Sequence, residues 1–272
     1  MRTALTIAGS DSSGGAGIQA DLKVFQSLDV YGLSAVTAVT AQNSRGVHKV
    51  NKVPPRTITA QIDAVTRDFG ADACKIGMLY TLQAVTVVAE RIARRKLQNV
   101  VLDTIIFAKD GTRLLLAKAV QRLRRDLIPR STIVTPNIVE AAELARVGIT
   151  DQSDAKNAAK IIHGFGPKYV LIKGGHFSGE PVDLLYDGEQ FFEYPGERIT
   201  GPPMHGTGCV LSAAIAARLA LGDSVPDAVG FSKDYVTAAI KNSIVLGKGS
   251  LSYFTGNSDS DIKRKAVPGG KK

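Results

Sequence analysis

Short apolar runs alternate with segments of helical spacing along almost the whole of this sequence, and this alternation limits the folds it can adopt. The runs that we interpret as strands are residues 5–8, 33–40, 73–78, 100–102, 133–134 and 169–172. Uninterrupted apolar strands between helices are typical of a parallel sheet that is covered on both faces. We therefore predict an α/β fold with a doubly wound, mostly parallel sheet and helices on both faces.

The remaining elements complete this pattern. Segments of helical spacing lie at 18–28, 58–69, 82–92, 114–127, 138–162, 208–221 and 225–244, and an edge strand is expected at 47–53. Residues 182–186 and 190–194 flank Asp187-Gly188, which is typical of a turn, so we expect a small edge hairpin. Because no linker interrupts the pattern, we predict a single domain over residues 1–255. The polar, basic tail at 256–272 is expected to be disordered.

Composition excludes several classes of protein. With 44% hydrophobic and 22% charged residues, the chain is an ordinary soluble globular protein. No apolar run is long enough to span a bilayer, and the first residues are typical of a strand rather than a signal peptide. The only cysteines, Cys74 and Cys209, argue against a disulfide framework and for a reducing compartment. We therefore expect a cytoplasmic protein without a membrane partner.

The formal net charge of +9 raises the question of nucleic-acid binding. Much of the excess lies in the tail and in expected helices, and no aromatic residues interleave with it to form a stacking surface. We therefore expect no nucleic-acid partner and attribute the charge to attraction of anionic substrates.

Residues 205–209, His-Gly-Thr-Gly-Cys, run directly into an alanine-rich segment that should be helical. The two glycines allow a tight turn, so the N–H groups of the first helical turn can converge on one anion. The same helix N-terminus is expected to lower the pKa of the Cys209 thiol and to make thiolate available near neutrality. An anion site beside a base suggests phosphoryl transfer. The alternative is an ordinary helix N-terminus with a small buried cysteine.

Polar or glycine-rich residues follow each expected parallel strand, and the carboxyl ends of such strands meet at one edge of the sheet. Asp103 and Glu140 suit a magnesium ion held mostly through water, and Lys173 could neutralise charge on a transferring phosphate. Taken singly, Asp103 and Asn137 could instead be helix caps, and Lys173 a solvated charge. Agreement among so many strand ends favours a shared site.

A dinucleotide-binding loop is the competing interpretation of the N-terminal glycines. Residues 15–20 match G-x-G-x-x-A, but residues 10–14 separate the first of these glycines from its strand. The expected acidic residue is also missing, because residues 33–44 contain no Asp or Glu. A dehydrogenase is therefore excluded.

Many short motifs occur in a fixed order along the chain, at residues 8–11, 14–23, 41–47, 75–79, 101–104, 135–137, 140–141, 173–176 and 205–209. In these motifs the sequence resembles the hydroxymethylpyrimidine/phosphomethylpyrimidine kinases of thiamine biosynthesis, which belong to the ribokinase-like superfamily. The resemblance covers residues from about 4 to 248. It implies a ribokinase-like fold, ATP and Mg²⁺ as cofactors, and a homodimer. The implied reaction is phosphorylation of a pyrimidine hydroxymethyl group, usually followed by phosphorylation of the monophosphate.

The resemblance also implies roles for individual residues. Substrate-binding roles fall on Gly17, Asp21, Gln42, Met78 and Ile105. Catalytic roles fall on Cys209 as the base, on Gly206, Thr207 and Gly208 as the anion hole, and on Lys173. Contacts with the ATP phosphates fall on Asn137, Lys173, His205 and Thr207, and magnesium is expected near Asp103 and Glu140.

The sequence also departs from the family pattern. Pro203-Met204 stands where the family usually has Asn-Thr, and the usual sequence after Gly249 is replaced. Two alternatives therefore remain. One is a pyridoxal kinase of the same fold, against which Gln42 argues. The other is a pyrimidine sensor without turnover, which Pro203-Met204 supports slightly and the retention of Asp103, Lys173 and Cys209 opposes.

Overall fold

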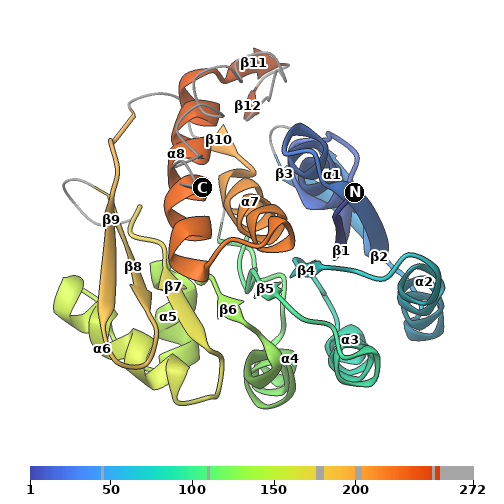
Figure 1. The fold of residues 1–272 in the computed structure, drawn as a ribbon, viewed down its shortest axis with the longest axis horizontal. Coiled ribbons are helices and arrows are strands. Elements are labelled where there is room, and N and C mark those ends of the chain that lie inside the picture. Colours follow the sequence, from blue (N-terminus) through green and yellow to red (C-terminus); the bar gives the residue numbers. More distant parts are fainter. Residues whose placement is uncertain (44–45, 109–110, 176–180, 200–203, 247–248, 252–272) are drawn as a thin grey trace, which may run out of the picture.

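A nine-stranded sheet forms the middle layer of the molecule (Figure 1). The computed structural model describes residues 1–43, 46–108, 111–175, 181–199, 204–246 and 249–251 of the 272-residue chain. The strand order is β3-β2-β1-β4-β5-β6-β7-β8-β9. The tail expected at 256–272 lies outside the described residues.

Six neighbouring strands of this sheet are parallel, so their carboxyl ends share one edge. They are β1 (Thr3–Asp11), β2 (Tyr31–Asn43), β4 (Ala73–Ile76), β5 (Val100–Leu102), β6 (Ile133–Val134) and β7 (Tyr169–Ile172). An antiparallel strand, β3 (Gly46–Lys52), closes one side, and the hairpin β8 (Val182–Tyr186) and β9 (Phe191–Pro195) closes the other. The predicted mostly parallel sheet and edge hairpin are both confirmed.

Helices cover both faces of the sheet (Figure 1). One face carries α1 (Gly17–Ser27), α7 (Thr207–Leu221) and α8 (Val225–Lys241). The other carries α2 (Pro55–Asp68), α3 (Leu82–Arg95), α4 (Ala117–Arg122), α5 (Ile138–Ala145) and α6 (Gln152–His163). Each face has its own apolar core: in β5, Val101 belongs to the α7 side and its neighbour Leu102 to the α3 side. Because successive residues of a strand point to opposite faces and both faces are covered by helices, the strands need apolar residues at every position.

Two of the predicted helices are interrupted in the structure. The segment expected as one helix at 138–162 is two helices, because Arg146 adopts a left-handed conformation (φ 59°) and ends α5. Asp151 then starts α6 by accepting the N–H of Asp154 at 2.9 Å. The expected helix at 114–127 is α4 followed by the π-helical turn η1 (Leu123–Leu127) and the 3₁₀ turn η2 (Ile128–Arg130).

A second, small sheet was not predicted from the sequence. It contains β10 (Met204–His205), β12 (Gly249–Leu251) and β11 (Ile244–Leu246), in that order. The helix expected to continue to residue 244 therefore ends at Lys241 as α8.

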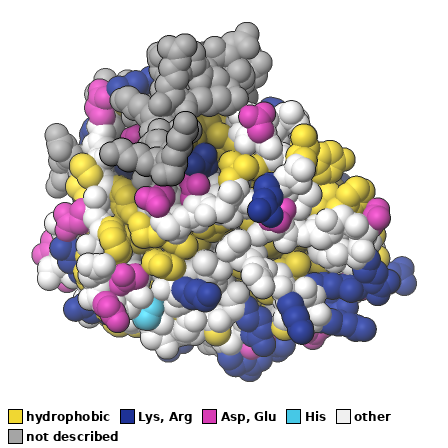
Figure 2. All heavy atoms as spheres, viewed as in Figure 1, with side chains coloured by type: hydrophobic (Ala, Val, Ile, Leu, Met, Phe, Trp, Pro, Cys, Tyr) yellow, Lys and Arg dark blue, Asp and Glu magenta, His cyan; other side chains and the backbone are white. Residues whose placement is uncertain are grey.

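Lys and Arg side chains gather along the lower right of one face, over α2, α3 and α4 (Figure 2). Three of them, Arg67, Arg91 and Arg95, form ion pairs with Asp63. Because α3 ends beside the beginning of β5, this surface lies away from the carboxyl ends of the strands. This part of the positive charge therefore lies away from the carboxyl ends of the strands, and the attraction of anionic substrates by the net charge stays a prediction. Across the described helices, none is both long and apolar enough to cross a bilayer.

Candidate active site

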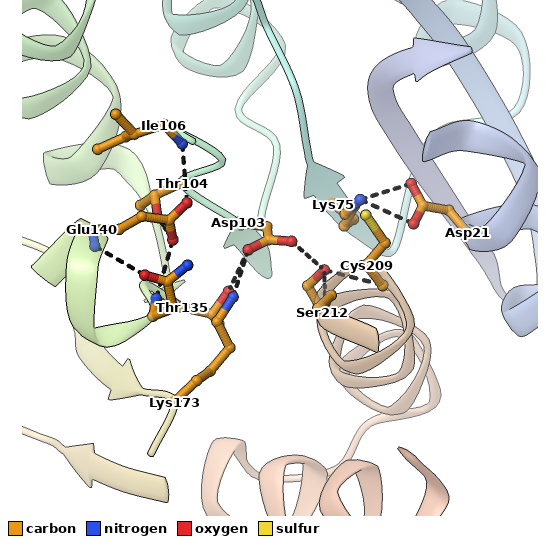
Figure 3. Close-up of polar contacts among 12 residues, drawn as sticks. Asp21, Lys75, Asp103, Thr104, Ile106, Thr135, Glu140, Lys173, Cys209 and Ser212 are labelled. Atoms are coloured by element: carbon orange, nitrogen blue, oxygen red, sulfur yellow. Dashed lines mark hydrogen bonds and ion pairs between the residues drawn. The ribbon is translucent and has the colours of Figure 1, made fainter. Parts of the chain in front are cut away.

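The start of α7 forms the centre of the strand-end site (Figure 3). Gly206 precedes this helix with φ 89°, and a Cβ there would lie 1.9 Å from the carbonyl oxygen of Gly15. Only glycine fits this position. As the N-cap, Gly206 has no side chain to accept from the N–H groups of Thr207, Gly208 and Cys209. These groups and the helix dipole therefore favour an anion at this point.

Lys173, directly after β7, reaches the same point. Its Nζ donates to Oδ1 of Asp103 at 2.9 Å and lies 3.5 Å from where a Cβ on Gly208 would be. Burial works to lower the pKa of Lys173, but the carboxylates of Asp103 and Glu140 outweigh it, and the pKa is raised. The side chain is 17% exposed. Lys173 therefore presents a permanent cation to any anion bound at the start of α7.

Asp103 follows β5 and is only 2% exposed. Besides the bond from Lys173, its Oδ1 accepts from Thr135 Oγ1 at 3.4 Å and its Oδ2 from Ser212 Oγ at 3.3 Å. It thus connects three elements: β6 through Thr135, β7 through Lys173 and α7 through Ser212. Asp103 holds the cation of Lys173 against the first turns of α7.

Glu140 and Asn137 form a capping box at the start of α5. The Glu140 N–H donates to Asn137 Oδ1 at 2.9 Å, and the Asn137 N–H donates to Glu140 Oε2 at 3.0 Å. Glu140 also accepts from Thr104 Oγ1 at 2.8 Å and from the Ile106 N–H at 3.0 Å. These bonds bracket Ile105, a β-branched residue at φ 30°, which is a strained conformation. The sequence alternative that Asn137 caps a helix is confirmed.

The carboxylates of Asp103 and Glu140 do not form a direct metal site. All four of their oxygens accept hydrogen bonds from protein donors, one of them the Lys173 ammonium group. Within the described parts of the chain, no group of three or more His, Cys, Asp or Glu side chains could hold an ion. Asp103 and Glu140 therefore belong to no preformed cluster of three such ligands among the described residues. A magnesium ion held mostly through water near them stays a prediction.

Cys209 lies between the N-termini of α1 and α7. The residue is 8% exposed, and its sulfur accepts a hydrogen bond from the N–H of Gly17, the first residue of α1. Burial raises the pKa of Cys209 to about 11; Lys75 opposes this shift, whereas Asp21 and Asp103 add to it. The predicted thiolate near neutrality is therefore wrong, because the cost of burying the charged sulfur exceeds the help of the helix N-termini.

A fully buried ion pair lies beside this cysteine. Lys75 in β4 donates from Nζ to Oδ1 and Oδ2 of Asp21 in α1 at 2.9 and 2.8 Å, and neither side chain is exposed. Thr6 Oγ1 donates to the same carboxylate at 2.6 Å. Asp21 thus presents no exposed oxygen, and its expected hydrogen bond to a substrate stays a prediction. A role for Lys75 was not predicted from the sequence; the available signal was a single charge inside the apolar run 73–78.

The expected substrate residues line the same edge of the sheet. Gln42, at the end of β2, accepts from Thr40 Oγ1 through its Oε1 at 3.2 Å. Met78 follows β4 and packs over Gly9, where a Cβ would lie 2.5 Å from its Cε. Gln42, Met78 and Ile105 are all half-buried. Their contact with a pyrimidine stays a prediction.

A family model described as phosphomethylpyrimidine kinase matches residues 11–253. The chain belongs to this family. Hydroxymethylpyrimidine/phosphomethylpyrimidine kinase of Streptomyces coelicolor is 46% identical over 245 residues, which cover 90% of this chain and 91% of that protein. The thiamine biosynthesis bifunctional protein of Geobacter sulfurreducens is 44% identical over 246 residues, and the chain spans 50% of its length.

Solved structures of the family have the same fold. Phosphomethylpyrimidine kinase from Clostridium difficile gives a TM-score of 0.81 at 42% identity, covering 88% of this chain and 100% of that one. Pyridoxal kinase from Bacillus subtilis, in an ADP complex, gives a TM-score of 0.87 at 42% identity, covering 93% and 97%. The ribokinase-like fold is therefore confirmed, and both pyrimidine and vitamin B6 kinases are among the similar proteins.

Some of the positions at which this chain departs from the family pattern lie on paired strands. Met204 and His205 in β10 pair with Ser250 and Leu251 in β12. For these strands only the backbone is described, so the expected contact of His205 with ATP stays a prediction. Pro203 lies outside the described residues. The described departures, Met204 and Ser250–Leu251, thus belong to one small sheet, whose strand β10 directly precedes α7.

Proposed function

We propose that this protein is a cytoplasmic kinase of thiamine biosynthesis. It phosphorylates 4-amino-5-hydroxymethyl-2-methylpyrimidine with ATP and then phosphorylates the monophosphate to the diphosphate. Family membership supports the kinase reaction and its substrate class. The observation that carries the proposal is the convergence of Lys173 and Cys209 on the start of α7.

The anion hole explains how the transferring group is stabilised. The N–H groups of Thr207, Gly208 and Cys209 and the Lys173 ammonium group are fixed before the reaction begins. Such preorganised donors stabilise charge on a transferring phosphoryl group without reorganisation. Asn137, His205 and Thr207 are proposed to contact the remaining phosphates of ATP. Magnesium accompanying ATP would neutralise phosphate charge.

Cys209 is proposed to accept the proton of the substrate hydroxyl group. The substrate O–H bond breaks and an S–H bond forms on the thiolate, while the substrate oxygen bonds to the γ-phosphorus. The bridging P–O bond then breaks, and its electron pair leaves with ADP. Because burial raises the pKa of Cys209 to about 11, the reactive thiolate is the minor form near neutrality.

Gln42 and Met78 are proposed to select the pyrimidine. An amide offers both a donor and an acceptor to the alternating polar atoms of an aminopyrimidine edge. A half-buried methionine over Gly9 offers an apolar surface for the ring face. Pyridoxal is the competing substrate, since a pyridoxal kinase shares the fold.

Mass-resolved product analysis tests the proposal. The purified protein receives ATP, magnesium and, in parallel, hydroxymethylpyrimidine, its monophosphate or pyridoxal, with a Cys209→Ala variant as the matched control. Pyrimidine diphosphate from the parent protein alone supports both transfers and the role of Cys209. Pyridoxal phosphate as the dominant product would overturn the proposed substrate. Pyrimidine binding without any transfer would identify a sensor, and light scattering on the same sample checks the expected homodimer.

A further inference from the structure

The buried ion pair of Lys75 and Asp21 is expensive for the fold, and stability alone does not explain it. Both side chains are completely buried, and Ala73, Cys74 and Ile76 in the same strand are apolar and fully buried too. Removing two charges from water costs several kcal/mol per ion, and an apolar pair of similar volume is often as stable. A charged pair at such a buried position indicates that its charge has a functional role.

The position of Lys75 indicates what that use is. Its Nζ lies 2.8 Å from where a Cβ on Gly77 would be, at the strand-end edge of β4. In Figure 3 this ammonium group points at the Asp21 carboxylate with the sulfur of Cys209 drawn next to it, and Lys75 and Cys209 interact electrostatically. Asp21 lies one helical turn after Gly17, whose N–H donates to the same sulfur. One rigid helix, α1, thus fixes both the ion pair and a donor to Cys209.

The charges around Cys209 come from four elements. Lys75 in β4 and Lys173 after β7 are cations, and Asp21 in α1 and Asp103 after β5 are anions. Lys173 is partly exposed, bonded to Asp103 and aimed at the start of α7, where a phosphate is expected. Lys75 is the cation that is completely shielded from water. Its effect on the sulfur is therefore screened least.

We propose that Lys75 is a positioning residue for the transfer: its buried ammonium group, held by Asp21, stabilises the thiolate of Cys209 and sets the pH range in which Cys209 takes the substrate proton. This inference rests on the proposed function, because the proton belongs to that reaction. The thiol proton first goes to solvent, and the substrate hydroxyl proton replaces it on the sulfur during transfer. Asp21 limits this stabilisation of the thiolate, because its carboxylate partly neutralises the charge of Lys75.

The reactivity of Cys209 tests this inference without any turnover. A Cys74→Ala background leaves Cys209 as the single cysteine. In that background, the rate of iodoacetamide alkylation is measured against pH by intact mass, because thiolate is the reacting form. The variants are Lys75→Met, Asp21→Asn and the two together. Arg218→Met is the control, since it removes an ion pair with Asp223 at the far end of the same helix, α7.

The expected shifts have opposite signs. Lys75→Met removes the cation, so alkylation near neutrality falls by about tenfold or more. Asp21→Asn removes an anion, so the charge of the Lys75 ammonium group is no longer partly neutralised and acts more strongly on the Cys209 sulfur. Alkylation therefore rises by about tenfold. The alkylation rate of the double variant is expected to lie between those of the two single variants, and the rate of Arg218→Met should match that of the parent protein. If both single variants move in the same direction, as a loosened site would produce, or if neither moves, the inference is overturned.

Two further readouts separate this inference from the proposed function. The pH profile of kcat is expected to move to higher pH in Lys75→Met and to lower pH in Asp21→Asn; an unmoved profile would overturn the assignment of Lys75 to the transfer. Absence of product from the parent protein contradicts the proposed function instead, whereas unshifted alkylation contradicts this inference. If Lys75→Met does not fold, the sign of the Asp21→Asn shift decides alone.

Discussion

The Nζ of Lys173 donates to Oδ1 of Asp103 at 2.9 Å while lying beside Gly208 in the first turn of α7. The carboxylate of Asp103 thus holds a cation at the helix end where an anion is favoured. An ion pair used in this way fixes geometry rather than adding stability.

Replacement of Lys173 by methionine is expected to reduce kcat by about 10²–10³-fold, since one preorganised donor to the phosphoryl group is lost. The KM for the pyrimidine should change little, because β5 and β6 separate β7, which carries Lys173 at its end, from β4 and β2, which carry Met78 and Gln42. Lys156→Met, which removes an exposed pair with Glu193, is the control. Steady-state kinetics that left kcat of Lys173→Met at the level of this control would contradict the role.

Gly206→Ala is expected to abolish transfer and to lower the melting temperature, because its Cβ would meet the Gly15 carbonyl oxygen at 1.9 Å. Gly222→Ala, at the other end of α7, is the matched control. It has φ 103° but nothing within 4 Å of the added Cβ, so it should cost only the left-handed backbone strain. That strain is about 1–2 kcal/mol. Equal losses of activity in the two variants would show that α7 stability, not the anion hole, is responsible.

Glu140→Gln tests whether this residue positions the pocket or binds a metal. The amide cannot accept from all three donors, Thr104, Ile106 and Asn137, so the strained turn at Ile105 is expected to relax. We expect a higher KM for the pyrimidine and about 1–3 kcal/mol less stability. Glu143→Gln, on the same helix and half-buried with an ion pair to Arg113, is the control. A changed magnesium requirement, measured by titration of activity, would instead indicate a metal role.

The rate of transfer is expected to rise with pH. Because burial raises the pKa of Cys209 to about 11, the sulfur is protonated near neutrality and the base is formed only as pH increases toward that value. A plot of log kcat against pH should therefore have a slope of about one below the pKa. Cys74→Ala should leave the profile unchanged, since that buried thiol lies in the core of the α3 face. A flat profile would exclude Cys209 as the base.

Several features of the site could be predicted from the sequence, because their signals are local. Apolar runs between helical segments identified the parallel strands, and their polar ends identified one shared edge. The glycine turn at the start of α7 and the helix cap at Asn137 also have local sequence signals, whereas the second half of the capping box, Glu140, was expected near magnesium. The break at Arg146 escaped prediction, since left-handed arginine carries no such local signal.

The tertiary structure alone decided which charges meet. Lys75 contacts Asp21 because β4 lies next to β1 and α1 packs over that part of the sheet. This arrangement depends on the order of the strands in the sheet. The ionisation of Cys209 was also beyond local reasoning. The helix N-terminus is visible in the sequence, but desolvation depends on everything packed around the sulfur. Sequence determines backbone patterns over a few residues, whereas burial and electrostatics are sums over neighbours that only the folded chain brings together.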